Sequence, residues 1–204
     1  GVAAGAAAET PELRAMALDH YATGLQWKRS HPELYAEGEK VQERAKAGQA
    51  ELDKIMAAAG AEVGAVKTLG NVKSVRSMVE KLVRKREQEK RTDYSFADVK
   101  DQARGAILLK SLAQVPALLK ALAKQGGVWK GEAFGQDGKG RFGYKGYHLT
   151  TVLPDGTGAE VQLHTPESWH LKETVSDPIY RRWRNFSDTQ IKDFGLKKEY
   201  WRDV

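Results

Sequence analysis

Two segments with alternating polar and apolar side chains, joined by a short turn, constrain the fold of this chain most. Residues 144–153 and 159–164 flank the sequence Pro154-Asp155-Gly156-Thr157-Gly158, which has the composition of a tight turn. The two segments are therefore predicted to pair as a β-hairpin.

Side chains alternate between the two faces of a strand, so the hairpin should carry a polar face. If residues 161 and 163 face the core, then Glu160, Gln162 and His164 lie on the outer face. On the first strand, the same alternation places Tyr147 and His148 on opposite faces. The neighbouring Gly143 and Gly146 would let a ligand approach, and a tyrosine there either stacks a base, at about 1–3 kcal/mol, or packs in the core.

The remaining patterns predict an α+β fold with a mixed sheet of about five strands flanked by helices. Further strands are expected at 105–109 and 128–134, with a loop at 135–140 between the second of these and the hairpin. Apolar residues at helical spacing, capping residues and proline or glycine breaks predict the helices. These are expected at 10–29, 33–59, from 72 through the 80s, 112–125, 166–186 and from 188 towards the end.

The chain is expected to comprise residues 1–65, a linker with N-terminal helices, and a catalytic or binding domain at 66–204. The first residues are rich in glycine and alanine, which is typical of a linker, and the chain does not begin with methionine. We therefore expect a domain of a longer polypeptide. There is no run of about 18 apolar residues, so no membrane span is expected.

The net charge and the absence of cysteine limit the partners and the kinds of site that this chain can have. A net charge of +6 favours an anionic partner such as a nucleotide or RNA. The alternative is that the charge serves only to keep the protein soluble. The sequence contains no cysteine, which excludes disulfides, thiolate zinc sites and a cysteine nucleophile.

Lys73, Ser77 and Lys81 recur every four residues in a basic segment and should share one face of a helix. Two ammonium groups and a hydroxyl suit the oxygens of a polyphosphate. A solvated basic face gives the same pattern.

Asp101 precedes an apolar strand, and Glu160 lies on another strand. Two carboxylates from separate strands can hold one Mg²⁺, which keeps several waters and bridges substrate phosphates. An aspartate at such a place is also common as a turn or cap residue.

In this order, the motifs resemble the synthetase domain of the RelA/SpoT family over about Val66 to Arg184. Members carry K-S-x-x-S-[IM]-x-x-K-L, matched by residues 73–82, and a metal-binding aspartate before a strand, matched by Asp101. They also carry Gly-Tyr on a strand, matched by Gly146-Tyr147, and Glu-x-Gln-[IL]-x-Thr, matched by residues 160–165. The resemblance implies the synthetase (nucleotidyltransferase-like) fold and transfer of pyrophosphate from ATP to a nucleotide 3′-hydroxyl.

The resemblance assigns a role to each matched residue. Asp101 and Glu160 would be catalytic and bind Mg²⁺, with the glutamate placed to take the proton of the attacking hydroxyl. The donor ATP would be held by Lys73, Ser77, Lys81 and Arg104, and the acceptor by Tyr147, which stacks its base, with Lys145, His148, Gln162 and His164.

Four positions depart from the family pattern. An arginine pair usually sandwiches the adenine, but this chain has Asn71 and Ala106 there. Arg104 lies two residues before Ala106, so on a strand it shares the same face and can reach a similar place. The family arginines after Gly-Tyr and before the final threonine are replaced by His148 and His164.

The sequences YKGYH and EVQLHTPES are similar to a divergent branch of the family that includes phage-borne modules and toxin domains of secreted bacterial effectors. This resemblance implies a secreted toxin of the type VI class, acting in the target-cell cytoplasm, which makes (p)ppApp from adenosine nucleotides and so depletes ATP. It also implies an acidic immunity protein as partner. A pyrophosphokinase acting on the 3′ end of tRNA and a non-catalytic nucleotide- or RNA-binding module remain as alternatives.

Overall fold

The computed structural model describes residues 25–87, 89–134 and 146–178. The chain divides into two compact units. The described part of the first comprises residues 25–43 and 74–96, and that of the second 44–73 and 97–178. The boundary expected between residues 65 and 66 therefore falls inside the second unit.

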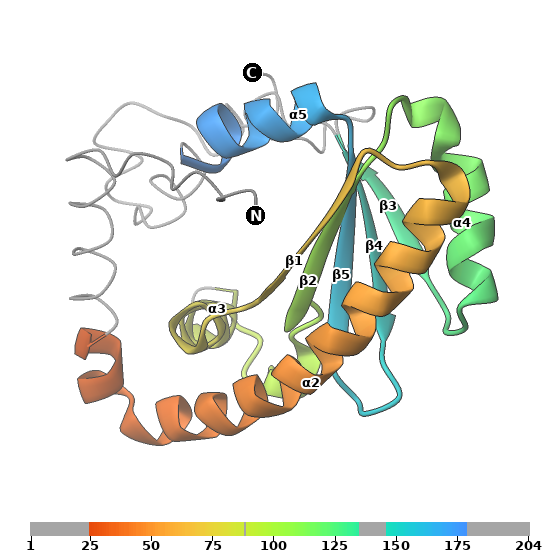
Figure 1. Ribbon diagram of the computed structural model, residues 1–204. Coiled ribbons are helices and arrows are strands. Elements are labelled where there is room, and N and C mark those ends of the chain that lie inside the picture. The colour runs from red at the N-terminus through yellow and green to blue at the C-terminus, as the bar shows by residue number, and fades with distance from the viewer. Residues whose placement is uncertain (1–24, 88, 135–145, 179–204) are drawn as a thin grey trace, which may run out of the picture. The chain divides into compact units, whose positions relative to one another are not determined.

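The second unit contains a five-stranded mixed sheet in the order β1-β2-β5-β4-β3, shown side by side in Figure 1. All neighbouring pairs are antiparallel except β2 and β5, which are parallel. The α+β fold and the count of about five strands are confirmed. The strands are β1 (Lys67–Val72), β2 (Ala103–Leu108), β3 (Lys130–Phe134), β4 (Gly146–Val152) and β5 (Gly158–His164).

One face of this sheet holds the apolar core of the second unit. Helix α2 (Pro32–Val63) contributes Leu52, Met56 and Ala59 to it, and α4 (Val115–Lys124) contributes a second apolar stripe. Both helices pack on the strand residues that alternate inward. These include Ala103, Ile107, Leu149, Ala159, Val161 and Leu163. The opposite face of the sheet, called the outer face below, carries the polar residues of the same strands.

In the first unit, α3 (Val75–Glu87) buries an apolar stripe, as its helical spacing predicts. The early part of α2 packs closely on it, because a Cβ on Gly38 would lie 3.0 Å from Val75 Cγ1. The buried residues of α3 are Val75, Met78, Val79, Leu82 and Val83.

Two segments differ from the sequence-based expectation. Strand β1 was not predicted, and it occupies the residues immediately before the predicted helix. The helix expected at 166–186 is confirmed over its described residues 166–178, but it contains a π-helical turn from Lys172 to Ser176 after α5 (Pro166–Leu171), which Thr165 caps. The rest of that range lies outside the described residues. The expected helices at 10–29 and after 188 and the expected loop at 135–140 lie wholly or mostly outside the described residues.

Two short 3₁₀ turns lie between these elements. They are Phe96–Asp98 and Leu112–Gln114, and a capping box of Ser111 and Gln114 begins the second. No helix among the described residues is both long enough and apolar enough to cross a membrane.

Candidate active site

The outer face of the sheet brings the predicted site residues of three strands into one row. Asn71 of β1 lies opposite Arg104 of β2, and Arg104 lies beside Glu160 of β5. Thr150 of β4 continues the row on the other side of Glu160. Side chains on the same row of neighbouring strands are about 5 Å apart, so Arg104 and Glu160 are neighbours.

Glu160 is held by two partners from the next row. The Nε2 of Gln162 donates to Glu160 Oε1 at 2.9 Å, and His148 Nδ1 lies 3.6 Å from Glu160 Oε2. Burial acts to raise the pKa of the Glu160 carboxyl, but the contacts with His148 and Gln162 outweigh it and hold the pKa below its usual value. Glu160 is therefore ionised at neutral pH.

Asp101 precedes β2 and forms an ion pair with Lys73. The Lys73 Nζ donates to Asp101 Oδ2 at 2.7 Å, and the two side chains are only 11% and 14% exposed. Asp101 also acts electrostatically on Glu160, so the two carboxylates lie within reach of one another's charge. The structure thus brings Lys73, Asp101 and Glu160 together.

Lys73 is not part of the helix in which the four-residue spacing placed it. Its backbone N–H donates to Gln102 O at 2.9 Å, so the residue continues the course of β1, and α3 begins only at Val75. Ser77 and Lys81 lie on α3, where Ser77 N–H donates to the hydroxyl of Ser74 at 3.2 Å. The shared phosphate-binding role of Lys73, Ser77 and Lys81 stays a prediction.

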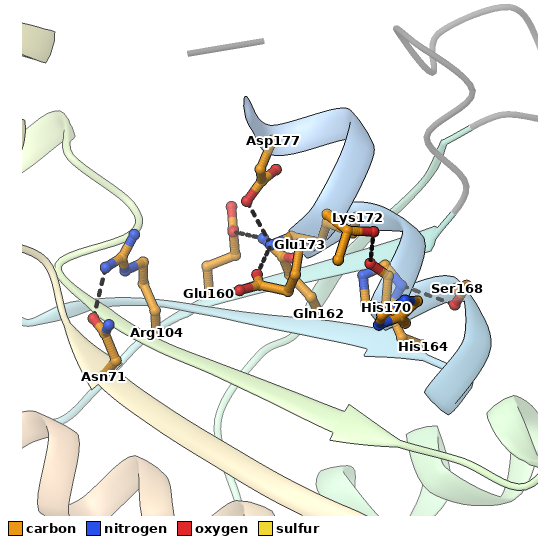
Figure 2. Close-up of polar contacts among 11 residues, drawn as sticks. Asn71, Arg104, Glu160, Gln162, His164, Ser168, His170, Lys172, Glu173 and Asp177 are labelled. Atoms are coloured by element: carbon orange, nitrogen blue, oxygen red, sulfur yellow. Dashed lines mark hydrogen bonds and ion pairs between the residues drawn. The ribbon is translucent and has the colours of Figure 1, made fainter. Parts of the chain in front are cut away.

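Arg104 reaches the residue that stands in place of the family arginine. Its Nη2 donates to Asn71 Oδ1 at 2.6 Å, as Figure 2 shows. Ala106 lies two residues along β2 and on the same face. The side chain of Arg104 therefore extends from β2 towards Asn71 of β1, which is one of the two positions where the family carries an arginine and this chain does not.

His164 and Lys172 form a buried group at the end of β5 (Figure 2). The His164 side chain is fully buried, and its Nδ1 lies 3.1 Å from the hydroxyl of Ser168. Burial, the positive charge of Lys172 and that of His148 lower the pKa of His164 to about 4, partly offset by Asp177. His164 is thus neutral at pH 7, unlike the arginine it replaces.

Lys172 has two carboxylate partners and an aromatic one. Its Nζ lies 2.9 Å from Glu173 Oε1 and 2.8 Å from Asp177 Oδ2, and 4.4 Å from the ring centre of Trp169. Asp177 lies five residues after Lys172, which is the hydrogen-bond spacing of the π-helical turn that begins at Lys172. Sequence reasoning did not single out Lys172, because one lysine within a predicted helix carries no signal of its own.

The structure does not bring Tyr147 together with Glu160, and its stacking of the acceptor base stays a prediction. It lies opposite Leu163 in the register of β4 and β5, so both side chains point to the core face. There the ring is partly buried against the core and lines an apolar cavity of about 500 Å³ with Trp129 and Leu149. Glu160 points to the other face. Lys145 and Tyr144 lie outside the described residues.

The carboxylates present suit Mg²⁺ better than a metal bound by protein side chains alone. Among the described residues, no three histidines or carboxylates gather into a metal-binding group. Asp101 and Glu160 supply two carboxylates from adjoining elements, and Mg²⁺ takes its other ligands from water and phosphate oxygens. The donor set therefore fits the predicted ion.

The architecture is that of the nucleotide pyrophosphokinases known as alarmone synthetases, the RelA/SpoT synthetase fold. The solved structure of small alarmone synthetase 1 from Bacillus subtilis is 15% identical over 78% of this chain and 86% of that chain, with a TM-score of 0.56. The same synthetase bound to its product pppGpp is 16% identical over 83% and 87%, with a TM-score of 0.52.

A more particular similarity is to a secretion effector. The type VI effector Tas1, solved in complex with its immunity protein, is 20% identical over 80% of this chain and 88% of that chain, with a TM-score of 0.53. No protein-family model and no curated protein sequence matches the chain. The predicted resemblance to a RelA/SpoT-like synthetase domain of the toxin branch is thus confirmed at the level of the fold.

Proposed function

We propose that this domain is a Mg²⁺-dependent pyrophosphokinase that transfers pyrophosphate from ATP to the 3′-hydroxyl of an adenosine nucleotide. The observation that carries the proposal is the outer-face group of Glu160, Asp101, Lys73 and Arg104 on the synthetase fold. An ionised glutamate beside an arginine, with a second carboxylate paired to a lysine, offers a base and cations in the same small region.

The reaction follows from these groups. The Glu160 carboxylate accepts the proton of the 3′-hydroxyl, and the hydroxyl oxygen forms a bond to the β-phosphorus of ATP. The bond between the β-phosphorus and the oxygen bridging to the α-phosphate breaks, and AMP leaves with the electron pair. Lys73 and Arg104 bind and orient the donor, which supports an in-line attack by positioning and charge neutralisation.

Asp101 and Glu160 would hold Mg²⁺ between them. When bound, the ion neutralises phosphate charge that develops as the bond to the α-phosphate breaks. Before substrate binds, the ion pair with Lys73 balances the negative charge of the nearly buried Asp101 carboxylate. Gln162 fixes the orientation of the Glu160 carboxylate by its hydrogen bond.

The experiment is a product analysis by mass. The purified domain is incubated with labelled ATP, Mg²⁺ and separately AMP, ADP, GDP or tRNA. We expect AMP and an adenosine nucleotide heavier by one pyrophosphate. The Glu160→Gln variant should lower the rate at least about 100-fold, because the base is lost while the side-chain volume is kept. Glu51→Gln, on the exposed side of α2, is the matched control.

Release of AMP without any pyrophosphorylated acceptor would overturn the proposed transfer. Full activity in Glu160→Gln would overturn the assigned base. A product on tRNA and none on nucleotides would favour the alternative acceptor, which has only the net charge of +6 in its support. An ATP-binding protein that forms no product on any acceptor would be the non-catalytic module.

We further propose that the enzyme is a secreted interbacterial toxin with an acidic immunity protein. The similarity to a type VI effector solved with its immunity protein and the net charge of +6 support this. Expression in the cytoplasm of a bacterial host should lower cellular ATP and arrest growth, and expression of the Glu160→Gln variant should not. A pull-down from producing cells that recovers no acidic protein would count against the partner.

A further inference from the structure

Arg104 is held through its backbone by a side chain from α2. The Gln49 amide lies under β2, where its Oε1 accepts from the backbone N–H of Arg104 at 2.9 Å and its Nε2 donates to the carbonyl of Arg104 at 2.9 Å. Gln49 is only 7% exposed. One side-chain amide thus satisfies both backbone polar groups of this one residue, as a neighbouring strand would.

The amide of Gln49 is itself oriented. Its Nε2 also donates to Asp53 Oδ1 at 2.8 Å, one helical turn along α2. The space for both side chains exists because residue 70 on β1 is glycine. A Cβ on Gly70 would lie 2.1 Å from Asp53 Oδ1 and 2.7 Å from Gln49 Nε2. Any side chain at residue 70 would therefore displace the ends of Gln49 and Asp53 from these positions.

On the other face of the sheet, the side chain of Arg104 is oriented by Asn71. The hydrogen bond to Asn71 Oδ1 fixes Nη2 at 2.6 Å, while Nε is buried and has no partner among the described residues. A buried N–H of a cation without an acceptor is costly, so this orientation is not the one that stability alone would select. Such an arrangement is typical of a residue held for binding.

We propose that Gln49 and Asp53 of α2, together with Asn71 of β1, are positioning residues that hold Arg104 for the base of the donor nucleotide. The inference rests on the proposed function and deepens it, because it assigns part of the donor site to α2. A planar guanidinium fixed at both its backbone and its tip presents its face to a purine ring. One held arginine then takes the place of a pair.

The energetic reason is preorganisation. An arginine side chain loses considerable rotamer freedom when it binds a ligand, and a side chain already fixed loses less on binding. Removal of a positioning residue should therefore weaken donor binding while the chemical step is preserved. The KM for ATP should rise, and kcat should stay near its original value.

The test measures the Kd of a non-hydrolysable ATP analogue together with the KM for ATP. Asn71→Ala should raise both about ten-fold, and Asn71→Asp, which keeps an acceptor for Nη2, should restore them to within about three-fold. Asn71 is exposed, so the variant should remain folded. Gln49→Ala should act in the same direction. Gln125→Ala, at the exposed end of α4, is the control.

A double-mutant cycle separates positioning from an independent contact. If Asn71 acts through Arg104, the Asn71→Ala change should have no further effect in an Arg104→Ala background. Additive effects would overturn the proposal, as would an unchanged ATP-analogue Kd in Asn71→Ala. An equal rise in the KM for the acceptor would also contradict it.

A measurement without nucleotide distinguishes failure of this inference from failure of the proposed function. The side-chain Nε–H of Arg104 should give an ordered NMR signal in the original protein and a more mobile one in Asn71→Ala. The backbone amide of Arg104 should exchange faster in Gln49→Ala. If the original protein binds no ATP analogue, the proposed function fails. If the Arg104 Nε–H signal and the exchange rate of the Arg104 amide are unchanged in the variants, the positioning of Arg104 is overturned, whatever the outcome for ATP.

Discussion

Lys73 and Asp101 are joined by a 2.7 Å ion pair, although the family resemblance assigns phosphate to the first and Mg²⁺ to the second. Each group therefore compensates the charge of the other before substrate arrives. Both side chains are nearly buried, so separating them without new partners would be costly. In the proposed function, the donor phosphates would become the partners of Lys73 and the ion the partner of Asp101.

The Asp101→Ala variant should lower the free energy of unfolding by about 3 kcal/mol, because it leaves the Lys73 ammonium buried without this carboxylate. The double variant Lys73→Met with Asp101→Ala should recover much of that loss. Chemical denaturation measures both. If the double variant is as unstable as the single one, the cost does not come from the charge of Lys73.

His148 should set the acid limb of the pH–rate profile. Contact with His148 lowers the pKa of Glu160, so in His148→Ala that pKa should rise. Because the base must be ionised, the fall in kcat/KM at low pH should then begin at a higher pH. A profile that keeps its acid limb in place would exclude either the contact or the role of Glu160 as base.

The buried His164 should make the protein less stable in mild acid. Its folded-state pKa of about 4 lies below the ordinary value of 6.5, so between these pH values the unfolded chain binds a proton that the folded protein does not. Stability should fall by about 3 kcal/mol from this group as the pH drops from 6.5 to 4, and remain unaffected above 6.5.

The matched variant for that measurement is His164→Gln, which cannot titrate in this range. Denaturation curves at pH 7, 5.5 and 4 should show a smaller loss of stability in the variant than in the original protein. Equal losses would mean that His164 is protonated in the folded state as readily as in the unfolded chain.

The position of Tyr147 on the core face leads to a prediction opposite to the one the sequence suggested. Tyr147→Leu, which removes the ring but keeps an apolar side chain, should leave the KM for the acceptor within about two-fold of its original value, because the ring is not on the face that carries Glu160. Steady-state kinetics measures this. A KM raised ten-fold or more would return Tyr147 to the acceptor site.

Gly158 should be required for the chain segment that leads to Asp101. A Cβ at residue 158 would lie 2.5 Å from the carbonyl oxygen of Val99 and 2.9 Å from the Cα of Lys100, and backbone atoms cannot move aside cheaply. Gly158→Ala should cost about 2 kcal/mol and lower activity. Gly156→Asn in the adjoining turn, where nothing lies within 4 Å, is the control and should cost little, since asparagine tolerates a positive φ.

The β4–β5 hairpin and the outward position of Glu160 could be predicted from the sequence because strand alternation is strict and one face is apolar. The edge strand β1 could not. Its sequence KTLGNV holds a glycine and an asparagine, which are typical of turns, and only its pairing with β2 makes it a strand. The assignment of Lys73 to a helix followed from that omission.

The candidate site was predictable where one short motif contains the residue, as for Asp101 and Glu160. The contact between Asn71 and Arg104 depends on the register of two strands whose paired residues are 33 positions apart, which no local pattern encodes. Gln49 was hidden for a similar reason, because one glutamine among the polar residues of a long helix has no signature. The positions that the sequence predicted are thus local, and the contacts that it missed are tertiary.

Gly70 of β1 lies opposite Gly105 of β2. Gly70 is exposed to solvent, and Gly105 is partly exposed. A Cβ on Gly105 would lie 2.1 Å from Met56 Sδ, and one on Gly70 would displace Gln49 and Asp53. A saturation-mutagenesis map should therefore show a cost at both positions, although residue 70 is exposed and residue 105 only partly buried. In a divergent homologue, loss of either glycine would indicate that α2 packs differently against β1 and β2.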